Sequence, residues 1–566
     1  MKYILLAVAA AAVFTPVHAA QSSFPAFVDS YLDHFSQFHP SIAAGNGLHA
    51  HDGELEDFSA QSIAKEVEYL HGARRQLDGF AQSDLTADQK VDRRILQGIV
   101  DGWLLDLETV KTWSRNPMIY AAAISDGLHD LISMESAPAP VRLDHVRSKL
   151  RAIPQLIAAE QANVKSPPKV FVERAIAMLG GVEELISHDL PLAFPNAKLE
   201  EAGAAREQIA SFKKYLQTNV LPTANGSYVV GIANVEARYR AEELIDLPAS
   251  KLLAIGEREL ARTQREFTQT AAKVDPARPA IDVWRVIQDN HPARGQVVPA
   301  ARAVVNELFA FIEQHHLMTL PAEHEIVVAP APAYDLGLAS MHSSPPLEPN
   351  PDRSYYYITD ADATWPVAKQ NEWLRTFNYA TLADISAHEV APGHFVHSLY
   401  MRKTPGKVRR IWIGLNPFPQ PSSGQDGWAH YAEQMVSEQG FEANDPRYRL
   451  AMLAESLNRL CRLIAGINLH SGKWSVDEAE AFFQREAHLP AAAAEREAVR
   501  GTYDPTYGGY ALGKLAAYKL RRDYQKAQGA AFNLREFHER VMTDGIAPWW
   551  AHRQLLLPDD TGTVLE

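Results

Sequence analysis

The stretch TLADISAHEVAPGHFVHSLY, residues 381–400, decides how this chain folds and what it can bind. It nearly contains the pattern H-E-x-x-H, in which two histidines on one helical face hold zinc and the glutamate acts as general base. Here the second histidine comes two residues late, because His388 and Glu389 are followed by His394. Six helical steps place the two rings roughly 240° apart. A regular helix would therefore not bring both histidines to one ion.

Two residues between the histidines are suited to leaving a helix and rejoining it. Pro392 removes a backbone donor and disfavours helical geometry at Ala391. Gly393 follows it and tolerates almost any φ. The sequence therefore predicts a bulge of two extra residues, after which the helix resumes with His394 on the same face as His388.

A hydrolytic zinc site also needs a third protein ligand, commonly a carboxylate from a second helix. The segment QDGWAHYAEQMVSEQG, residues 425–440, predicts such a helix. Glu433 lies on its apolar side with Trp428 and Tyr431, where an unpaired carboxylate would be costly. Glu438 is the rival ligand, but its more polar neighbours indicate a surface charge. Glu433 is therefore the predicted third ligand of one zinc ion per chain.

The rest of the chain has a predominantly helical period. Apolar residues recur at three- and four-residue spacing in segments 64–80, 169–190, 201–221 and 247–274, and a long helical pattern over 365–389 leads into the motif. Segments 324–334 and 353–360 are rich in β-branched or aromatic residues and predict two strands just before the motif. We therefore expect a mainly α fold with a small β-sheet next to the zinc-binding helix.

The length of 566 residues, 46% of them apolar, exceeds what one compact core accommodates. We expect two lobes, residues 21–250 and 251–566, with the zinc site in the second.

Residues 1–20 have the basic start, apolar run and small-residue end of a signal peptide, which predicts an exported protein, periplasmic or secreted. No later segment is apolar over the length of a membrane span.

Charge and cysteine content narrow the classes of function. The net charge of -14 and the absence of a long basic block argue against nucleic acid as a partner. The densest basic stretch, residues 402–410, is either a solvated loop or an attractor of anionic substrate ends. Cys461 is the only cysteine, so we expect a buried thiol and no internal disulfide.

The motif and several other blocks resemble one known family. HEVAPGH is similar to the H-E-x-x-P-G-H block of the bacterial DUF885 family, a group related to the gluzincin metallopeptidases. Further similar blocks are residues 38–59, 170–181, 354–360, 427–435 and 507–521. The resemblance implies a two-lobed helical fold with a deep cleft, zinc at its base, and hydrolysis of a peptide or related amide. It also implies His388, His394 and Glu433 as ligands and Glu389 as the catalytic residue.

Four other residues are predicted to act on the substrate. Tyr510 resembles the tyrosine that stabilises the oxyanion in related zinc peptidases, although a cleft-wall aromatic is the alternative. His397 stands where the family usually has glutamine, and it could touch substrate, orient His394 or act as an extra ligand. Arg521 or Arg522 could hold a substrate carboxylate, unless both are ordinary exposed helix residues.

The expected reaction is hydrolysis of short peptides, by an exopeptidase of the carboxypeptidase kind or an oligopeptidase. Zinc lowers the pKa of a bound water to about 7, and Glu389 takes the proton as that water attacks a carbonyl carbon. A zinc-dependent esterase or amidase and an inactive periplasmic peptide-binding protein are the alternatives. The absence of G-x-S-x-G disfavours a serine hydrolase. The oligomeric state is left open.

Overall fold

A computed structural model describes residues 23–322, 324–331, 337–349, 351, 353–411 and 422–566 of the chain. The predicted signal peptide, residues 1–20, lies outside the described residues. Helices dominate the described part, and one small sheet accompanies them, which confirms the predicted mainly α fold. Within these ranges no helix combines the length and apolar character needed to cross a membrane.

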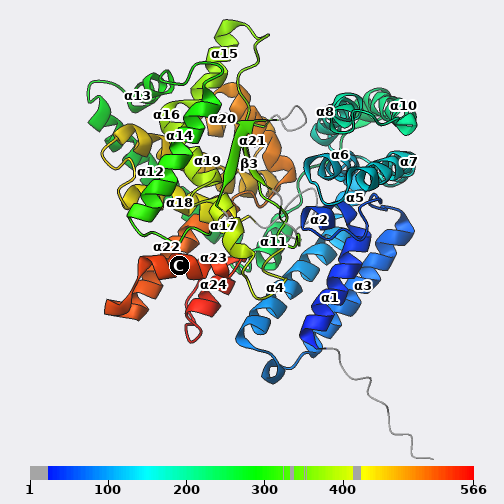
Figure 1. Cartoon of the computed structure of the whole chain (residues 1–566), viewed down its shortest axis with the longest axis horizontal. Coiled ribbons are helices and arrows are strands. Elements are labelled where there is room, and N and C mark those ends of the chain that lie inside the picture. Colours follow the sequence, from blue (N-terminus) through cyan, green and yellow to red (C-terminus); the bar gives the residue numbers. More distant parts are fainter. Residues whose placement is uncertain (1–22, 323, 332–336, 350, 352, 412–421) are drawn as a thin grey trace, which may run out of the picture.

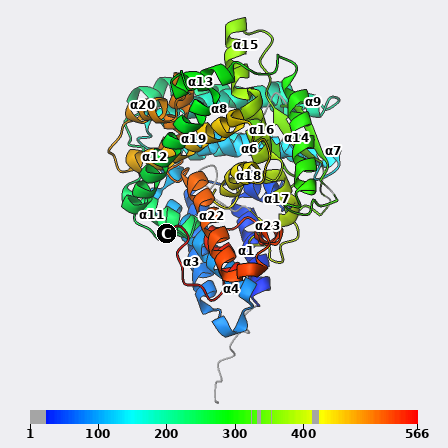
Figure 2. The same cartoon turned by 90° about the vertical axis from the view of Figure 1, so that its left-hand side faces the viewer.

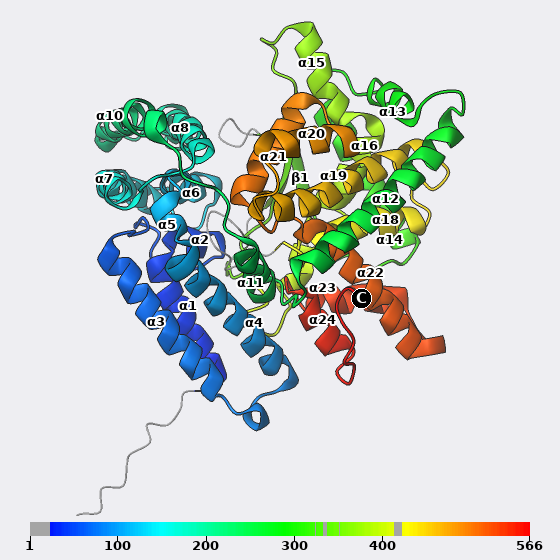
Figure 3. The ribbon, with the colours of Figure 1, turned by 180° about the vertical axis from the view of Figure 1, so that it is seen from behind.

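The first ten helices form the side of the molecule that Figure 1 draws in blue and cyan. They are α1 (Phe24–Phe38), α2 (Pro40–Gly45), α3 (Ala60–Gly79), α4 (Ala87–Leu104), α5 (Thr112–Arg115), α6 (Met118–Ser133), α7 (Ala139–Asn163), α8 (Lys169–Glu184), α9 (Leu190–Ala193) and α10 (Glu200–Tyr215). The helical patterns found in the sequence here coincide with α3, α8 and α10. Figure 3 shows α1, α3 and α4 side by side.

Of the remaining helices, α11 packs against α4, and α12 to α24 form the other side (Figure 1). They are α11 (Ile232–Glu242), α12 (Ala249–Val274), α13 (Ala280–Gln288), α14 (Val297–Gln314), α15 (Val367–Leu374), α16 (Tyr379–Glu389), α17 (His394–Met401), α18 (Asp426–Glu438), α19 (Pro446–His470), α20 (Val476–Glu486), α21 (Ala491–Tyr503), α22 (Gly509–Gln528), α23 (Leu534–Thr543) and α24 (Trp549–Leu556). The long helix α12 packs along α19, and α18 packs along α22 (Figure 2). Cys461 is buried in α19, as predicted.

The structure of the segment that precedes the motif differs from one prediction. The pattern over 365–389 is not one long helix, because α15 ends at Leu374 and α16 begins at Tyr379. Asn378 separates them, and its side chain accepts a hydrogen bond from the backbone N–H of Thr381. A side chain that satisfies a free N–H in this way favours a new helix start over continuation.

A three-stranded sheet lies beside α16. Its strands are β1 (Ile326–Pro330), β2 (Ala339–His342) and β3 (Ser354–Ile358), in the order β1-β3-β2. Strand β3 pairs in parallel with β1 and antiparallel with β2. The two predicted strands are confirmed over their described residues, whereas β2 was not predicted. The fully buried Tyr356 of β3 has its hydroxyl 3.4 Å from that of Ser386 in α16, so the sheet supports the helix that carries His388.

The two sides of the molecule share buried contacts. Ala547 and Ala551 belong to the same apolar cluster as the core of α1, α3 and α4. Arg409 is fully buried and donates to Asp92 of α4 over 2.6 Å, and also to Asp88 of the same helix. Its own carbonyl accepts from the N–H of Ile546. The division into lobes at residue 250 stays a prediction, and the structure links its two halves through Arg409.

Candidate metal centre

A four-residue turn joins the two helices of the motif. Helix α16 ends at Glu389 and α17 begins at His394, as the Pro392 and Gly393 pair predicts. The N–H of Gly393 donates to the carbonyl of Ala387 over 3.0 Å, which draws the turn back onto the end of α16. A Cβ atom at Gly393 would lie 1.7 Å from the carbonyl oxygen of His388. Only glycine permits this close approach.

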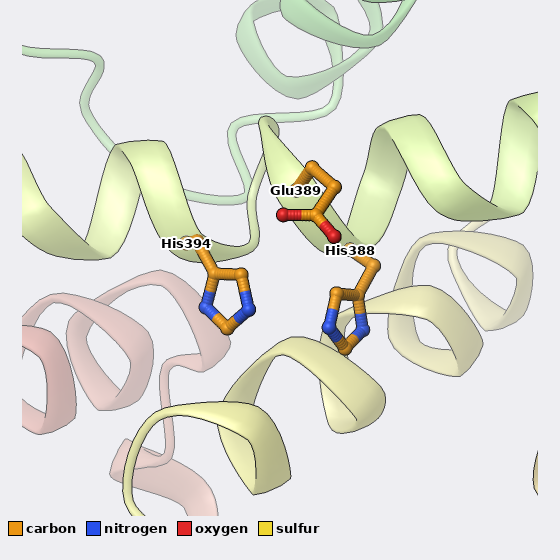
Figure 4. Close-up of side chains that lie close together, drawn as sticks. All are labelled: His388, Glu389 and His394. Carbon is orange, nitrogen blue, oxygen red and sulfur yellow. The ribbon is translucent and has the colours of Figure 1, made fainter. Parts of the chain in front are cut away.

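The turn brings the two histidines together. The ring centroids of His388 and His394 are 4.7 Å apart, with an angle of 85° between the ring planes. Figure 4 shows both rings on the same side of the motif, with the carboxylate of Glu389 next to them. One nitrogen or oxygen from each of these three residues lies within 4.8 Å of the others. The predicted return of His394 to the face of His388 is confirmed.

Glu433 contacts the ring of His388 and is fully buried. Its Oε1 atom accepts a hydrogen bond from Nδ1 of His388 over 2.6 Å and is 3.1 Å from the Arg459 guanidinium. Its Oε2 atom accepts from Nδ1 of His430 over 2.7 Å. Burial, with the nearby His394 and Arg459, holds the pKa of His388 well below its usual value, so the ring is neutral. This contact fixes the tautomer of His388 and leaves its Nε2 lone pair free.

Asp426, at the start of α18, faces that free nitrogen. Its Oδ1 atom is 3.9 Å from Nε2 of His388 and 3.4 Å from Nε2 of His394. Two donor atoms about 2.1 Å from a tetrahedral zinc ion are roughly 3.4 Å apart. Two histidines and a carboxylate are the donor set of many catalytic zinc sites, and His388, His394 and Glu389 offer ligand atoms within 4.8 Å of one another, with Asp426 beside the two rings. The residues present therefore fit the metal that the motif implies.

The same distances distinguish the two carboxylates. The 2.6 Å separation between Glu433 and His388 is that of a short hydrogen bond, and is too small for two atoms that share one zinc ion. Glu433 also binds the nitrogen of His388 that points away from Asp426. In this structure Glu433 contacts Nδ1 of His388 and Asp426 lies on the Nε2 side, and Glu433 as third ligand stays a prediction. Asp426, which the sequence reasoning did not name, precedes Glu433 by seven residues and so lies on the same face of α18.

Glu389 has the electrostatics of a general base. Burial raises the pKa of its carboxyl to about 7, with His394 acting in the opposite direction. A base whose pKa is close to the working pH combines a useful fraction of the ionised form with a strong drive to take a proton. Glu389 belongs, with His388 and His394, to the compact group of possible ligand atoms.

Tyr510 lies close enough to the centre to respond to its charges. Burial raises the pKa of its hydroxyl, and the negative charge of Asp426 adds to that effect. Arg462 and Arg500 lie over its ring, 5.0 and 5.6 Å from the centroid, and their positive charges act on the pKa in the opposite direction.

The other predicted substrate residues lie in different surroundings. His397 is buried, and its Nε2–H donates to the carbonyl of Gly545 over 3.2 Å, while burial lowers its pKa to about 3. Arg521 donates to the exposed Glu438 over 3.2 Å, and Arg522 is exposed. The two arginines lie about 16 to 18 Å along α22 from Tyr510. The structure brings neither arginine to the centre.

The comparisons agree with this fold. The model of a family described as "Bacterial protein of unknown function (DUF885)" matches residues 40–552. A candidate lipoprotein of unknown function from Shewanella oneidensis has a similar structure, with 23% identity, a TM-score of 0.79, and coverage of 95% of this chain and 100% of that one.

A second candidate lipoprotein, from Colwellia psychrerythraea, has 18% identity and a TM-score of 0.76, with coverage of 94% of this chain and 99% of that one. At these identities the two structures show a shared fold. A comparison with curated proteins gives no match. The family match spans most of the sequence, from the second helix to the last one. This chain therefore belongs to the DUF885 family.

Proposed function

We propose that this chain is an exported zinc-dependent hydrolase that cleaves amide bonds of short peptides. One observation carries the proposal: Nε2 of His388 and Nε2 of His394 lie within 4 Å of the same Asp426 oxygen, with the carboxylate of Glu389 beside them. A peptide-binding protein has no need of a base at this place. The names of the two structural neighbours as candidate lipoproteins fit export to the periplasm or beyond.

Each residue of the proposed metal centre has its own role in the reaction. When bound, zinc supplies a Lewis acid that polarises a carbonyl and favours ionisation of water. His388, His394 and Asp426 hold the ion, and Glu433 keeps the His388 ring in the orientation that presents Nε2. The Glu389 carboxylate takes a proton from the attacking water and gives it to the leaving nitrogen.

Tyr510 completes the arrangement from α22. Its hydroxyl keeps its proton at neutral pH, because burial and the charge of Asp426 raise its pKa. A donor at this position stabilises the negative charge that develops on the carbonyl oxygen of the substrate. The same two arginines above its ring hold the tyrosine in place.

The proposal is tested on the purified full chain. Metal analysis should find about one zinc ion per chain, and a mixture of short synthetic peptides should be cleaved, as read by mass spectrometry. Removal of the metal with a chelator should stop cleavage, and added zinc should restore it. Cleavage that continues unchanged after complete zinc removal would overturn the proposal. Binding of peptides without any cleavage by the zinc-loaded protein would favour the binding-protein alternative.

A further inference from the structure

A cavity of about 340 Å³ lies next to the proposed metal centre. His394 and His397 of α17 line one wall, and α2 and α6 of the N-terminal side line the opposite wall. The volume lies at the small end of the range for small-molecule sites. A ligand in this cavity would contact a metal-site histidine directly, so the cavity is in a position to hold part of a substrate.

The wall formed by α6 is acidic. Asp126 and Asp130 both line the cavity and are four residues apart, hence neighbours on one helical face. Among the residues that the structure describes, no side chain or backbone group hydrogen-bonds to the Asp126 carboxylate. The Asp126 side chain is exposed and lines the cavity, so its carboxylate is accessible to a ligand there.

The opposite wall contributes a cation and an unsatisfied nitrogen. Arg410 lines the cavity, and its Nε atom has no hydrogen-bond partner among the described residues. The buried Nδ1 atom of His397 also lacks a partner there, because the ring bonds to Gly545 through Nε2. A guanidinium opposite two carboxylates disfavours a bare divalent cation and favours a polar organic ligand with an ammonium group at one end.

We propose that this cavity binds the α-ammonium group of a peptide, with Asp126 and Asp130 as its acceptors. The inference rests on the proposed function and specifies its substrate: short peptides with a free amino terminus. An ammonium group donates three hydrogen bonds and a carboxylate accepts them with charge assistance. With the amino terminus held beside His394, the bond that reaches Glu389 is one close to that end. The enzyme would thus act from the amino end of its substrates.

The test measures binding, so that it does not depend on turnover. Calorimetric titrations of the zinc-loaded Glu389→Gln protein would compare tetra-alanine with N-acetyl-tetra-alanine. Loss of one charge-assisted contact is expected to weaken binding roughly 10- to 100-fold. Asp126→Asn in the same background should bind both peptides with similar, weak affinity. Asp144→Asn, an exposed aspartate on α7, is the matched control and should preserve the difference.

Three results would overturn the inference. One is equal affinity of the free and acetylated peptides for the unaltered cavity, a comparison that needs no variant of Asp126. Another is an undiminished preference for the free peptide in both Asp126→Asn and Asp130→Asn, each checked for an unchanged melting temperature. The third is full recovery of affinity by an N-acetylated peptide whose first residue is lysine, which would assign the acidic wall to a basic side chain.

The inference and the proposed function fail in different ways. If the wild-type protein cleaves acetylated and free peptides equally well, the hydrolase proposal stands and the inference is wrong. If free peptides bind more tightly through Asp126 but no peptide is ever cleaved, the inference stands and the hydrolase proposal is wrong.

Discussion

Nδ1 of His388 lies 2.6 Å from Oε1 of Glu433, whereas Nε2 of the same ring lies 3.9 Å from Oδ1 of Asp426. The two carboxylates of α18 therefore use opposite edges of one imidazole. The near contact has the length of a hydrogen bond, and the far one is too long for a hydrogen bond. The two acids, which the sequence places on one helical face, therefore stand in different relations to His388, and variants of each can separate their roles.

The first prediction compares these two acids. Asp426→Ala removes a ligand, so zinc affinity should fall by several orders of magnitude. Glu433→Gln removes only the acceptor that orients His388, a kind of change that typically costs 10- to 100-fold. Competition with a chromogenic chelator measures both affinities. Glu438→Gln, on the exposed side of α18, should match the wild type.

The opposite order of effects would restore the prediction made from the sequence. If Glu433→Gln loses zinc while Asp426→Ala retains it, Glu433 is the ligand and the contact with His388 must rearrange when the metal binds.

The second prediction concerns the base. Glu389→Gln keeps the shape of the side chain and removes its ability to take a proton. The variant should retain zinc and bind peptide, while kcat falls by roughly three orders of magnitude or more, near or above the top of the usual range for a general base. Zinc analysis and initial rates with one peptide provide both readouts. Loss of zinc from this variant would make Glu389 a ligand, and an unchanged rate would place the chemistry elsewhere.

The third prediction concerns the turn between α16 and α17. Gly393→Ala would place a methyl carbon 1.7 Å from the carbonyl oxygen of His388, so the backbone must shift. Because that shift moves His394 relative to His388, zinc affinity should fall together with the melting temperature. Gly180→Ala in α8 meets no atom within 4 Å and should leave zinc affinity unchanged. A Gly393→Ala protein with full zinc affinity would contradict the close approach.

The fourth prediction concerns stability and pH. Glu160 in α7 is buried, its Oε2 atom has no partner among the described residues, and burial raises the pKa of its carboxyl to about 7. The unfolded chain releases this proton near the ordinary pKa of 4.5. The folded state therefore loses stability as pH rises from about 4.5 to about 7, by roughly 2–3 kcal/mol.

Glu160→Gln removes this titration. The variant should be more stable than the wild type at pH 8, and the advantage should vanish near pH 4.5. Melting temperatures across that range test the difference, with Glu207→Gln on the exposed face of α10 as control. An advantage that is independent of pH would show that ionisation of Glu160 is not its cause.

The local sequence was sufficient to predict the backbone conformation of the motif. The spacing of His388 and His394, together with Pro392 and Gly393, predicts the interrupted helix that the structure contains. The position of Asp426 beside the histidines could not be predicted in the same way. An acid in the first turn of a helix is common because it interacts well with the helix dipole, so its type carries no sign of a ligand. Only the packing of α16 against α18 shows that it faces the histidines.

Long-range partners explain the other differences. Arg521 pairs with Glu438, which lies 83 residues earlier in the chain, and this contact keeps it from the centre. The cavity likewise brings Asp126 and His394 together, although nearly half of the sequence separates them. Helical periodicity predicts which face of an element is apolar, but it does not predict which distant element covers that face.

The burial of Arg409 determines how the protein could be divided. Its guanidinium is fully enclosed and donates to Asp88 and Asp92 of α4. A truncated chain that starts at residue 251 would leave this cation without both carboxylates, and removal of one partner of a buried pair costs about 3–5 kcal/mol. Expression of the metal-binding half alone would therefore give an unstable fragment, and gene fusions or circular permutations of this protein need to keep α4 in the same chain.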